Sequence, residues 1–296
     1  MVDKERAWEG VTGGRTFGQK ALKIFFSVVP VRLGYVILVF VVPFYMLFAH
    51  TRYLAIYRYF RKQHGYPPLK SFFKSYRNHY LFGQMMFDRF ALYAGQQKFK
   101  IDNPDNDLFL QMVDALQGGI IASSHVGNPE LCGYLLSQQT KRINSLIFGG
   151  EAEEVRKNRK KILNDNNVRL IPVSDDMSHV FVLNEALSNG EMVSMPCDRV
   201  FGSTKTVECD FLNGKADFPV GAFVLALQYH LPVIALFVLK MPALLYRIHV
   251  IPVPLPRAGT KREQINEMTR SFAKILEGIV MQYPEQWFNF YPFWKP

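Results

Sequence analysis

The chain has 296 residues, of which 49% are hydrophobic and 14% aromatic, and it carries a formal net charge of +10. This length suits one large α/β domain with an appendage better than two full domains. The positive charge predicts an anionic partner, which could be nucleic acid, a membrane surface or an acidic carrier. The three cysteines, Cys132, Cys197 and Cys209, have unrelated spacings, so the sequence contains neither a disulfide framework nor a zinc-binding pattern, and we expect no metal.

An uncharged apolar segment, Leu33 to Ala49, is the first distinct feature along the chain. Its length is at the lower limit for spanning a bilayer, and Pro43 within it is compatible with a kinked span or a re-entrant segment. A signal peptide fits poorly, because the charged leader is long and no small-residue cleavage site follows. A buried core helix is the alternative interpretation. We favour a membrane anchor, and leave open whether it crosses the bilayer or lies in its interface.

The region around this segment is strongly basic and rich in tyrosine and phenylalanine. From Lys20 to Lys100 the only acidic residue is Asp88, against thirteen lysines and arginines. Such a composition next to an apolar run is typical of helices that lie in an anionic lipid interface. Nucleic-acid binding would explain the charge but not the apolar run, so we predict anionic membrane lipid and no nucleic acid as partner. The positive-inside tendency then places the following domain on the cytoplasmic side.

From residue 101 the sequence alternates between strand-like and helix-like runs. We therefore divide the chain into a membrane-anchoring and basic interfacial helical region (1–100) and an α/β domain (101–296), with a mixed, largely parallel sheet flanked by helices. Apart from the strand described next, the expected strands are Ile143–Phe148, Val168–Val173, Met192–Met195, Pro232–Leu239 and Tyr246–Val250, with a hairpin over Val207–Phe211 and Lys215–Phe218. The expected helices are Leu108–Leu116, Glu151–Leu163, Met177–Leu187, Gly221–Tyr229 and a last helix opened by the capping-box pattern Thr260-x-x-Glu263.

The most informative stretch runs from Gly119 to Glu130. Small and β-branched residues after a glycine pair predict a short buried strand, which ends at His125, and the Asn128-Pro129 pair predicts a helix start at Glu130. A histidine at a strand end lies at the carboxyl edge of the sheet, where α/β folds bind substrates. Glu130 in the next helical turn could fix the tautomer of the ring and stabilise its imidazolium form. A lone histidine at such a position is, however, more often a satisfied polar residue than a catalyst.

Several common catalytic motifs are absent from the sequence. There is no GxSxG, GxxxxGK[ST], GxGxxG or HExxH pattern, so hydrolase, nucleotide-binding and zinc-protease functions have no motif support. Ser123 and Ser124 precede His125, but neighbours along a strand point to opposite faces, which disfavours a Ser-His dyad. A histidine base without a protein nucleophile suits direct transfer, in which it deprotonates an acceptor that attacks an activated acyl group.

His125 and Glu130 also open an ordered series of short motifs, and the series resembles one known family. It is similar to the bacterial lipid A biosynthesis acyltransferases, within the lysophospholipid acyltransferase superfamily, over about residues 30 to 294. Arg199 stands where this family usually has glutamine, and the region after Arg159 lacks its usual glycine, so the chain looks like a divergent member. The other motifs are the charged helix with Arg159 (or Arg156), Ala186–Gly190, Asp198-Arg199, Phe211–Ala216 with Gly221 and Leu225-Ala226, Pro232-Val233, and Pro284–Trp287.

This resemblance implies a glycerolipid-acyltransferase-like fold on the cytoplasmic face of the bacterial inner membrane. It implies transfer of a fatty acyl chain to a hydroxyl of a lipid A-type glycolipid, with acyl-carrier protein or acyl-CoA carrying the donor chain and no further cofactor. His125 would be the general base and Glu130 its orienting partner. The candidate substrate-binding residues are Arg159, Asp198, Arg199 and Asn128.

Three alternatives stay open at this point. The acceptor could be another lipid, such as a lysophospholipid or an aminolipid. Water could replace the acceptor, which would make the protein an acyl-thioesterase. The chain could also be a non-catalytic membrane module that binds anionic lipid through its basic region.

Overall fold

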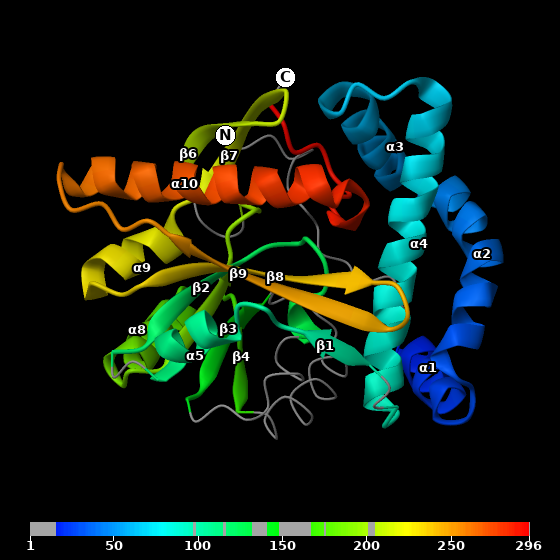
Figure 1. Cartoon of the computed structure of the whole chain (residues 1–296), viewed down its shortest axis with the longest axis horizontal. Coiled ribbons are helices and arrows are strands. Elements are labelled where there is room, and N and C mark those ends of the chain that lie inside the picture. Colours follow the sequence, from blue (N-terminus) through cyan, green and yellow to red (C-terminus); the bar gives the residue numbers. More distant parts are fainter. Residues whose placement is uncertain are drawn as a thin grey trace.

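The computed structural model describes residues 16–96, 99–114, 117–131, 141–147, 167–174, 176–200 and 205–295. In this part of the chain a seven-stranded sheet has the order β1-β9-β8-β2-β5-β3-β4, and β6 pairs with β7 in a separate hairpin (Figure 1). Neighbouring strands of the large sheet are parallel except β8 and β9, which confirms the predicted fold class. The strands are β1 (Lys100–Asp102), β2 (Gly119–Ser123), β3 (Ile143–Ile147), β4 (Val168–Pro172), β5 (Met192–Pro196), β6 (Thr206–Phe211), β7 (Gly214–Pro219), β8 (Val233–Met241) and β9 (Leu245–Val253).

Helices flank this sheet and extend from one side of it. Helix α4 stands beside the sheet and α2 lies on the outer side of α4, while α10 crosses above the strands (Figure 1). The helices are α1 (Thr16–Val28), α2 (Val31–Phe48), α3 (His50–Arg58), a π-helical turn (Tyr59–Gln63), α4 (Pro68–Tyr93), α5 (Asn106–Asp114), α8 (Ser178–Ser188), α9 (Gly221–Tyr229), α10 (Lys261–Gln282) and a 3-10 turn (Pro284–Gln286).

The two faces of the sheet bury two different hydrophobic cores. Along β8, Val233, Ala235, Phe237 and Leu239 belong to the core shared with α8, α9, α10 and the β6–β7 hairpin. The alternate residues Ile234, Leu236 and Val238 belong to the core shared with α5. A strand covered on both faces reads as a continuous apolar run, which is why this strand was evident in the sequence. Strand β2 lies between β8 and β5 and is buried along its whole length.

The element boundaries differ from prediction in a few places. Strand β9 continues to Val253, three residues past the expected end, although Pro252 cannot donate a ladder hydrogen bond. This is tolerated because β1 covers only Leu245 to Arg247, so β9 is an edge strand at Pro252. Strand β1 is only three residues long and was not predicted. The expected helix Glu151–Leu163 and the end of the expected strand Ile143–Phe148 lie outside the described residues.

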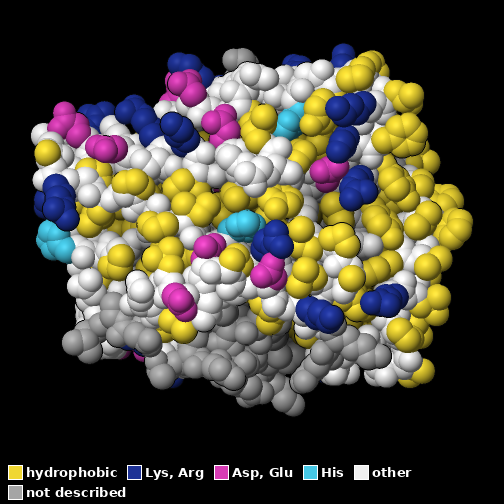
Figure 2. All heavy atoms as spheres, viewed as in Figure 1, with side chains coloured by type: hydrophobic (Ala, Val, Ile, Leu, Met, Phe, Trp, Pro, Cys, Tyr) yellow, Lys and Arg dark blue, Asp and Glu magenta, His cyan; other side chains and the backbone are white. Residues whose placement is uncertain are grey.

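Helices α2 and α4 pack closely along each other. The residues of α2 that face α4 recur every three or four positions and are Val31, Gly34, Leu38, Val42 and Met46. Gly34 and Gly83 allow this close approach: a Cβ atom on Gly34 would lie 2.9 Å from the Phe87 ring, and one on Gly83 would lie 3.0 Å from Leu38. The opposite face of α2 exposes Phe40, Phe44, Phe48 and other large apolar residues. Figure 2 shows hydrophobic side chains gathered along the edge where α2 lies in Figure 1.

A buried ion pair joins this helix pair to the sheet. Asp88 of α4 is fully buried and accepts hydrogen bonds from Lys240 of β8, from Tyr246 of β9 and from Tyr35 of α2. The Lys240 ammonium also donates to the Tyr35 hydroxyl at 2.9 Å. Burial lowers the pKa of Lys240, and Asp88 opposes that shift. The only acid of the basic region is therefore a structural counter-ion, and contacts cross the expected domain boundary at residue 100.

We expect Asp88→Asn to destabilise the fold by about 3–5 kcal/mol, because it leaves the buried Lys240 ammonium without its counter-ion. Chemical denaturation measures this change. The matched control is Asp102→Asn, which breaks an ion pair to Arg247 whose two side chains are 39% and 38% exposed; we expect a cost below about 1 kcal/mol. In the double variant with Lys240→Met, the loss should be clearly smaller than the sum of the single losses. Additive losses would contradict a coupled buried pair.

Candidate active site

The loop that follows β2 is held by backbone hydrogen bonds on two sides. On one side Gly127 N–H donates to Gln286 O at 2.8 Å, and Phe288 N–H donates to His125 O at 3.0 Å. On the other side Asn128 N–H donates to Val238 O of β8 at 2.7 Å. The segment that contains Gln286 and Phe288 thus forms a short bridge to the loop and fixes the backbone of His125.

Glycine is required at position 127 for two reasons. Its φ is +67°, in the region that residues with a Cβ rarely adopt, and a Cβ atom would lie 2.1 Å from the carbonyl oxygen of Val238. This close approach lets the loop bond to both β8 and the C-terminal segment. The next helix begins at Pro129, one residue before the start at Glu130 that the Asn-Pro pair predicted.

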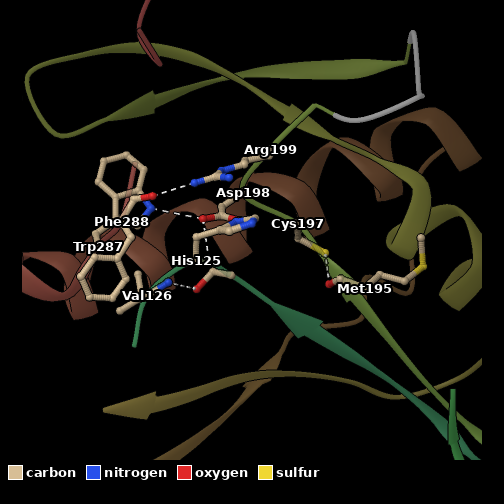
Figure 3. Close-up of polar contacts among 9 residues, drawn as sticks. His125, Val126, Met195, Cys197, Asp198, Arg199, Trp287 and Phe288 are labelled. Carbon is tan, nitrogen blue, oxygen red and sulfur yellow. Dashed lines mark hydrogen bonds and ion pairs between the residues drawn. The ribbon is translucent and has the colours of Figure 1, made fainter. Parts of the chain in front are cut away.

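Asp198 is the carboxylate that accepts from the His125 ring. Nδ1 of His125 lies 2.8 Å from Oδ1 of Asp198, and the His125 backbone N–H donates to Oδ2 of the same side chain at 2.8 Å (Figure 3). Because a carboxylate only accepts, Nδ1 carries the proton and the neutral ring has its lone pair at Nε2. A third of the His125 side chain (33%) is exposed, whereas that of Asp198 is only 1% exposed.

A second group of contacts fixes Asp198 itself. The indole Nε1 of Trp287 donates to Oδ2 of Asp198 at 3.2 Å, and Trp287 is 1% exposed. Arg199 donates to Phe288 O at 2.6 Å (Figure 3). Its guanidinium also lies over the Tyr291 ring, 5.4 Å from the ring centroid. The chain after β5 and the C-terminal segment therefore meet at His125, and each holds the other in place.

The charges around His125 keep it neutral and Asp198 ionised. Burial lowers the pKa of His125 and the Arg199 cation lowers it further, against the raising effect of Asp198. Burial alone would raise the pKa of Asp198, but its electrostatic interaction and hydrogen bonds with His125, together with the Arg199 cation, lower it. A neutral imidazole with an anionic partner at Nδ1 is the form of a general base at neutral pH.

Cys197 beside this pair is not a candidate nucleophile. Its thiol donates to Met195 O at 3.3 Å (Figure 3), and burial raises the pKa of Cys197, so the thiolate is disfavoured. Within the described residues no group of three or more His, Cys, Asp or Glu side chains is placed to hold a metal ion. The arrangement suits proton abstraction from a substrate.

Glu130 makes different contacts from those expected. Its carboxylate accepts from Arg89 and, at 2.6 Å, from the Tyr93 hydroxyl, and both donors belong to α4. The carboxylate that fixes the tautomer at Nδ1 is Asp198, so this part of the expected role of Glu130 is corrected. Sequence spacing suggested Glu130 because it is close along the chain, whereas Asp198 comes next to His125 only through the pairing of β2 with β5. A role of Glu130 at the reacting centre stays a prediction.

The other expected site residues divide into three cases. Arg199 lies beside the His125–Asp198 pair, but the residue is only 7% exposed and its guanidinium contacts protein groups. Asn128 is in the same loop and is 6% exposed, with its side chain next to Tyr246. Arg159, like the alternative Arg156, lies outside the described residues. Substrate binding by these residues stays a prediction.

Trp287, Arg89 and Tyr93 are the site residues that sequence analysis did not assign. Trp287 was part of the closing Pro284–Trp287 motif. Its place in that motif was the signal by which the sequence could have assigned it to the site. Arg89 was counted as one of many cations. The sequence did contain one signal: Arg89 directly follows Asp88, which is the only acidic residue between Lys20 and Lys100.

Comparison with known proteins identifies the family. Residues 61–296, more than three-quarters of the chain, match the model of the family described as bacterial lipid A biosynthesis acyltransferase. The chain belongs to this family. It is therefore an acyltransferase, and the predicted membership is confirmed. No curated protein matches the chain. The matched region begins before α4, so this acyltransferase includes α4 in its family-defining part, together with the strands that carry His125 and Asp198.

We expect Gly127→Ala to destabilise the acyltransferase by about 3 kcal/mol or more, because the new Cβ meets the Val238 backbone in a strained conformation. Thermal or chemical denaturation measures the loss. Gly278→Ala is the matched control, since Gly278 lies in α10 and a Cβ atom there would meet nothing within 4 Å apart from the neighbouring backbone of its own helix. That change should be neutral or stabilise by about 0.5–1 kcal/mol. Equal stability of the two variants would show that the loop does not need a glycine.

Proposed function

We propose that this acyltransferase transfers a fatty acyl chain from an acyl thioester to a hydroxyl of a lipid A-type glycolipid, with His125 as general base. The observation that carries the proposal is the His125–Asp198 pair at the carboxyl edge of the central strand β2, in a chain of this family. The neutral ring carries its lone pair on Nε2, the atom that accepts a proton, and the nearby Cys197 is unsuited to form an acyl-enzyme. Direct attack by the acceptor follows from this arrangement.

The proposed step balances as follows. Nε2 of His125 takes the proton of the acceptor hydroxyl while the oxygen of that hydroxyl forms a bond to the thioester carbonyl carbon. The tetrahedral intermediate collapses, the C–S bond breaks, and the imidazolium returns the proton to the leaving thiolate. Asp198 stabilises the imidazolium through Nδ1, and Trp287 keeps the Asp198 carboxylate in place. Glu130 supplies a second carboxylate, from the first turn of the helix that follows the His125 loop.

We propose acyl-carrier protein as the donor, with acyl-CoA as the alternative, and no further cofactor. The net charge of +10 supports an acidic donor protein and an anionic acceptor lipid. Arg159 and Arg199 remain the proposed contacts to the phosphate groups of a substrate, with Asn128 and Asp198 as further substrate-binding candidates. If the acceptor is instead a lysophospholipid or an aminolipid, His125 would still be the base and the acyl thioester would still be the donor.

For the membrane, we propose that α2 lies in the interface on the cytoplasmic face of the inner membrane. Among the described residues α2 (Val31–Phe48) is the one helix long and apolar enough to cross a membrane. Its 18 residues extend about 27 Å, close to the thickness of a bilayer core. Length alone therefore permits a span.

The packing of α2 favours the interface over a span. Along α2, Tyr35 bonds to Asp88 and Val39 O accepts from the Tyr76 hydroxyl, so α4 accompanies α2 over most of its length. The same part of α4 is attached to the α/β domain, since Asn78 donates to Trp287 O at 2.9 Å and Asp88 pairs with Lys240. A bilayer surrounding α2 would have to enclose this polar helix and the edge of the domain. A bilayer touching only the exposed apolar face of α2 avoids that cost.

The enzymatic prediction is tested by acyl transfer with labelled acyl-carrier protein and bacterial lipid extracts. We expect His125→Ala to lower kcat by about 100-fold or more, and Asp198→Asn by about 100- to 10,000-fold, because the tautomer and the imidazolium lose their support. The mass of the labelled product identifies the acceptor.

The pH profile supplies an independent check. Because the pKa of His125 is lowered, its base form is lost only below about pH 6.5, and the wild-type kcat should fall there. Asp198→Asn removes a group that raises this pKa, so the acidic limb should move to lower pH. Equal rates in the wild type, His125→Ala and Asp198→Asn would contradict the catalytic role and favour a lipid-binding module. Release of free fatty acid without a labelled lipid would favour a thioesterase.

The membrane prediction is tested with Ser27→Cys and Thr51→Cys, exposed polar positions that flank α2 at its two ends. An impermeant maleimide added to inside-out membrane vesicles should label both cysteines, and in right-side-out vesicles neither, if α2 lies in the interface. Labelling of the two ends from opposite sides would show a span. Flotation with anionic vesicles should weaken for Phe44→Ser, whereas the control Phe181→Ser on α8, 75% exposed, should bind like the wild type.

A further inference from the structure

Two side chains of α4 hold both oxygens of the Glu130 carboxylate. Arg89 donates to Oε2 and forms an ion pair, and the Tyr93 hydroxyl donates to Oε1 at 2.6 Å. Arg89 and Tyr93 are four residues apart, so they project from the same face of the helix in successive turns. The Glu130 side chain is 9% exposed and that of Arg89 is 20% exposed. A carboxylate bonded through both oxygens to donors on a rigid helix has little freedom to rotate.

The end of α4 is itself fixed relative to the histidine loop. Asp88, the residue before Arg89, pairs with Lys240 of β8. The backbone of Lys240 exchanges two hydrogen bonds of 2.8 Å with the Gln286 side chain, and Gln286 O accepts from Gly127 N–H. A continuous set of buried contacts therefore links α4 to the loop between His125 and Glu130. These contacts therefore fix the position of Arg89 relative to the loop between His125 and Glu130.

We propose that Arg89 and Tyr93 are positioning residues for the acyl-transfer reaction, which act by holding the Glu130 carboxylate in its reactive orientation. This inference rests on the proposed function, because it assumes that Glu130 supports the reaction. Helix α4, which also carries the membrane-facing α2, is then a part of the catalytic apparatus and not only of the anchor. Misplacement of one reacting or supporting group by about 1 Å can cost on the order of 100-fold in rate.

An ion pair of this kind could instead be purely structural, or Arg89 could act on the substrate directly. The three roles differ in the kinetic constant they affect. A positioning role lowers kcat and disappears when Glu130 is neutral. A substrate contact raises KM whether or not Glu130 is charged, and a structural role lowers thermal stability without changing kcat of the folded fraction.

The test compares Arg89→Met, Arg89→Lys, Tyr93→Phe and Glu130→Gln, alone and with the double variant Arg89→Met/Glu130→Gln, in the acyl-transfer assay. We expect Arg89→Met to lower kcat about 10- to 100-fold with KM changed less than about 3-fold, and Tyr93→Phe to lower kcat about 3- to 10-fold. Arg89→Lys should recover part of the rate, since it keeps a cation but not the guanidinium geometry. The double variant should be no slower than Glu130→Gln.

Arg247→Met is the control, because it breaks a more exposed Arg–carboxylate pair, to Asp102 at the β1 edge of the sheet; its kcat should equal that of the wild type. Unchanged kcat in Arg89→Met or in Glu130→Gln, while His125→Ala is inactive, would overturn the positioning role and leave the proposed function intact. Multiplying losses in the double variant would also overturn it. Activity in His125→Ala would instead overturn the proposed function. Should Arg89→Met fail to fold, Tyr93→Phe and Arg89→Lys in the Glu130→Gln background supply the same comparison.

Discussion

The hydrogen bond between the His125 ring and Asp198 brings together three parts of the chain that are far apart in sequence. The loop after β2 supplies the histidine, the end of β5 supplies the carboxylate, and the C-terminal segment supplies Trp287, which donates to that carboxylate. The backbone bonds of Gly127 and Phe288 join two of these parts, the loop after β2 and the C-terminal segment. If any one of them moved, the ring would lose its tautomer and its orientation together. The rest of the fold can be understood as the support of this junction.

The electrostatics of the junction depend on two buried side chains of opposite charge beside His125. Asp198 is anionic, Arg199 is cationic, and His125 between them is neutral at physiological pH. The Arg199 cation disfavours protonation of the His125 ring, and the Asp198 anion favours it. Opposite influences on one ring allow it to act as a base without being permanently charged.

The N-terminal helices connect this chemistry to a surface. On one side α4 contacts the α/β domain through Asn78, Asp88 and Arg89, and on the other it packs against α2. The apolar face of α2 that remains exposed is turned away from the domain (Figure 2). A single helix thus separates an acyltransferase site from an apolar surface. This placement supports the proposed lipid acceptor and water-soluble donor.

The sequence by itself determined the alternation of strands and helices, the apolar α2, the general-base candidate and the family, because these depend on local periodicity and on short motifs. It located His125 close to the end of a buried strand, since burial on both faces leaves a continuous apolar run, although β2 ends at Ser123 and His125 lies in the loop that follows. Only the tertiary structure decided which carboxylate serves the ring. Glu130 is five residues away in sequence and Asp198 is 73, yet the β2–β5 pairing brings Asp198 to Nδ1 while the helix direction takes Glu130 to Arg89. Contacts between distant segments leave no periodic trace in a single sequence, so the role of Asp88, the bridge through Trp287 and the orientation of α2 appeared only in the packed chain.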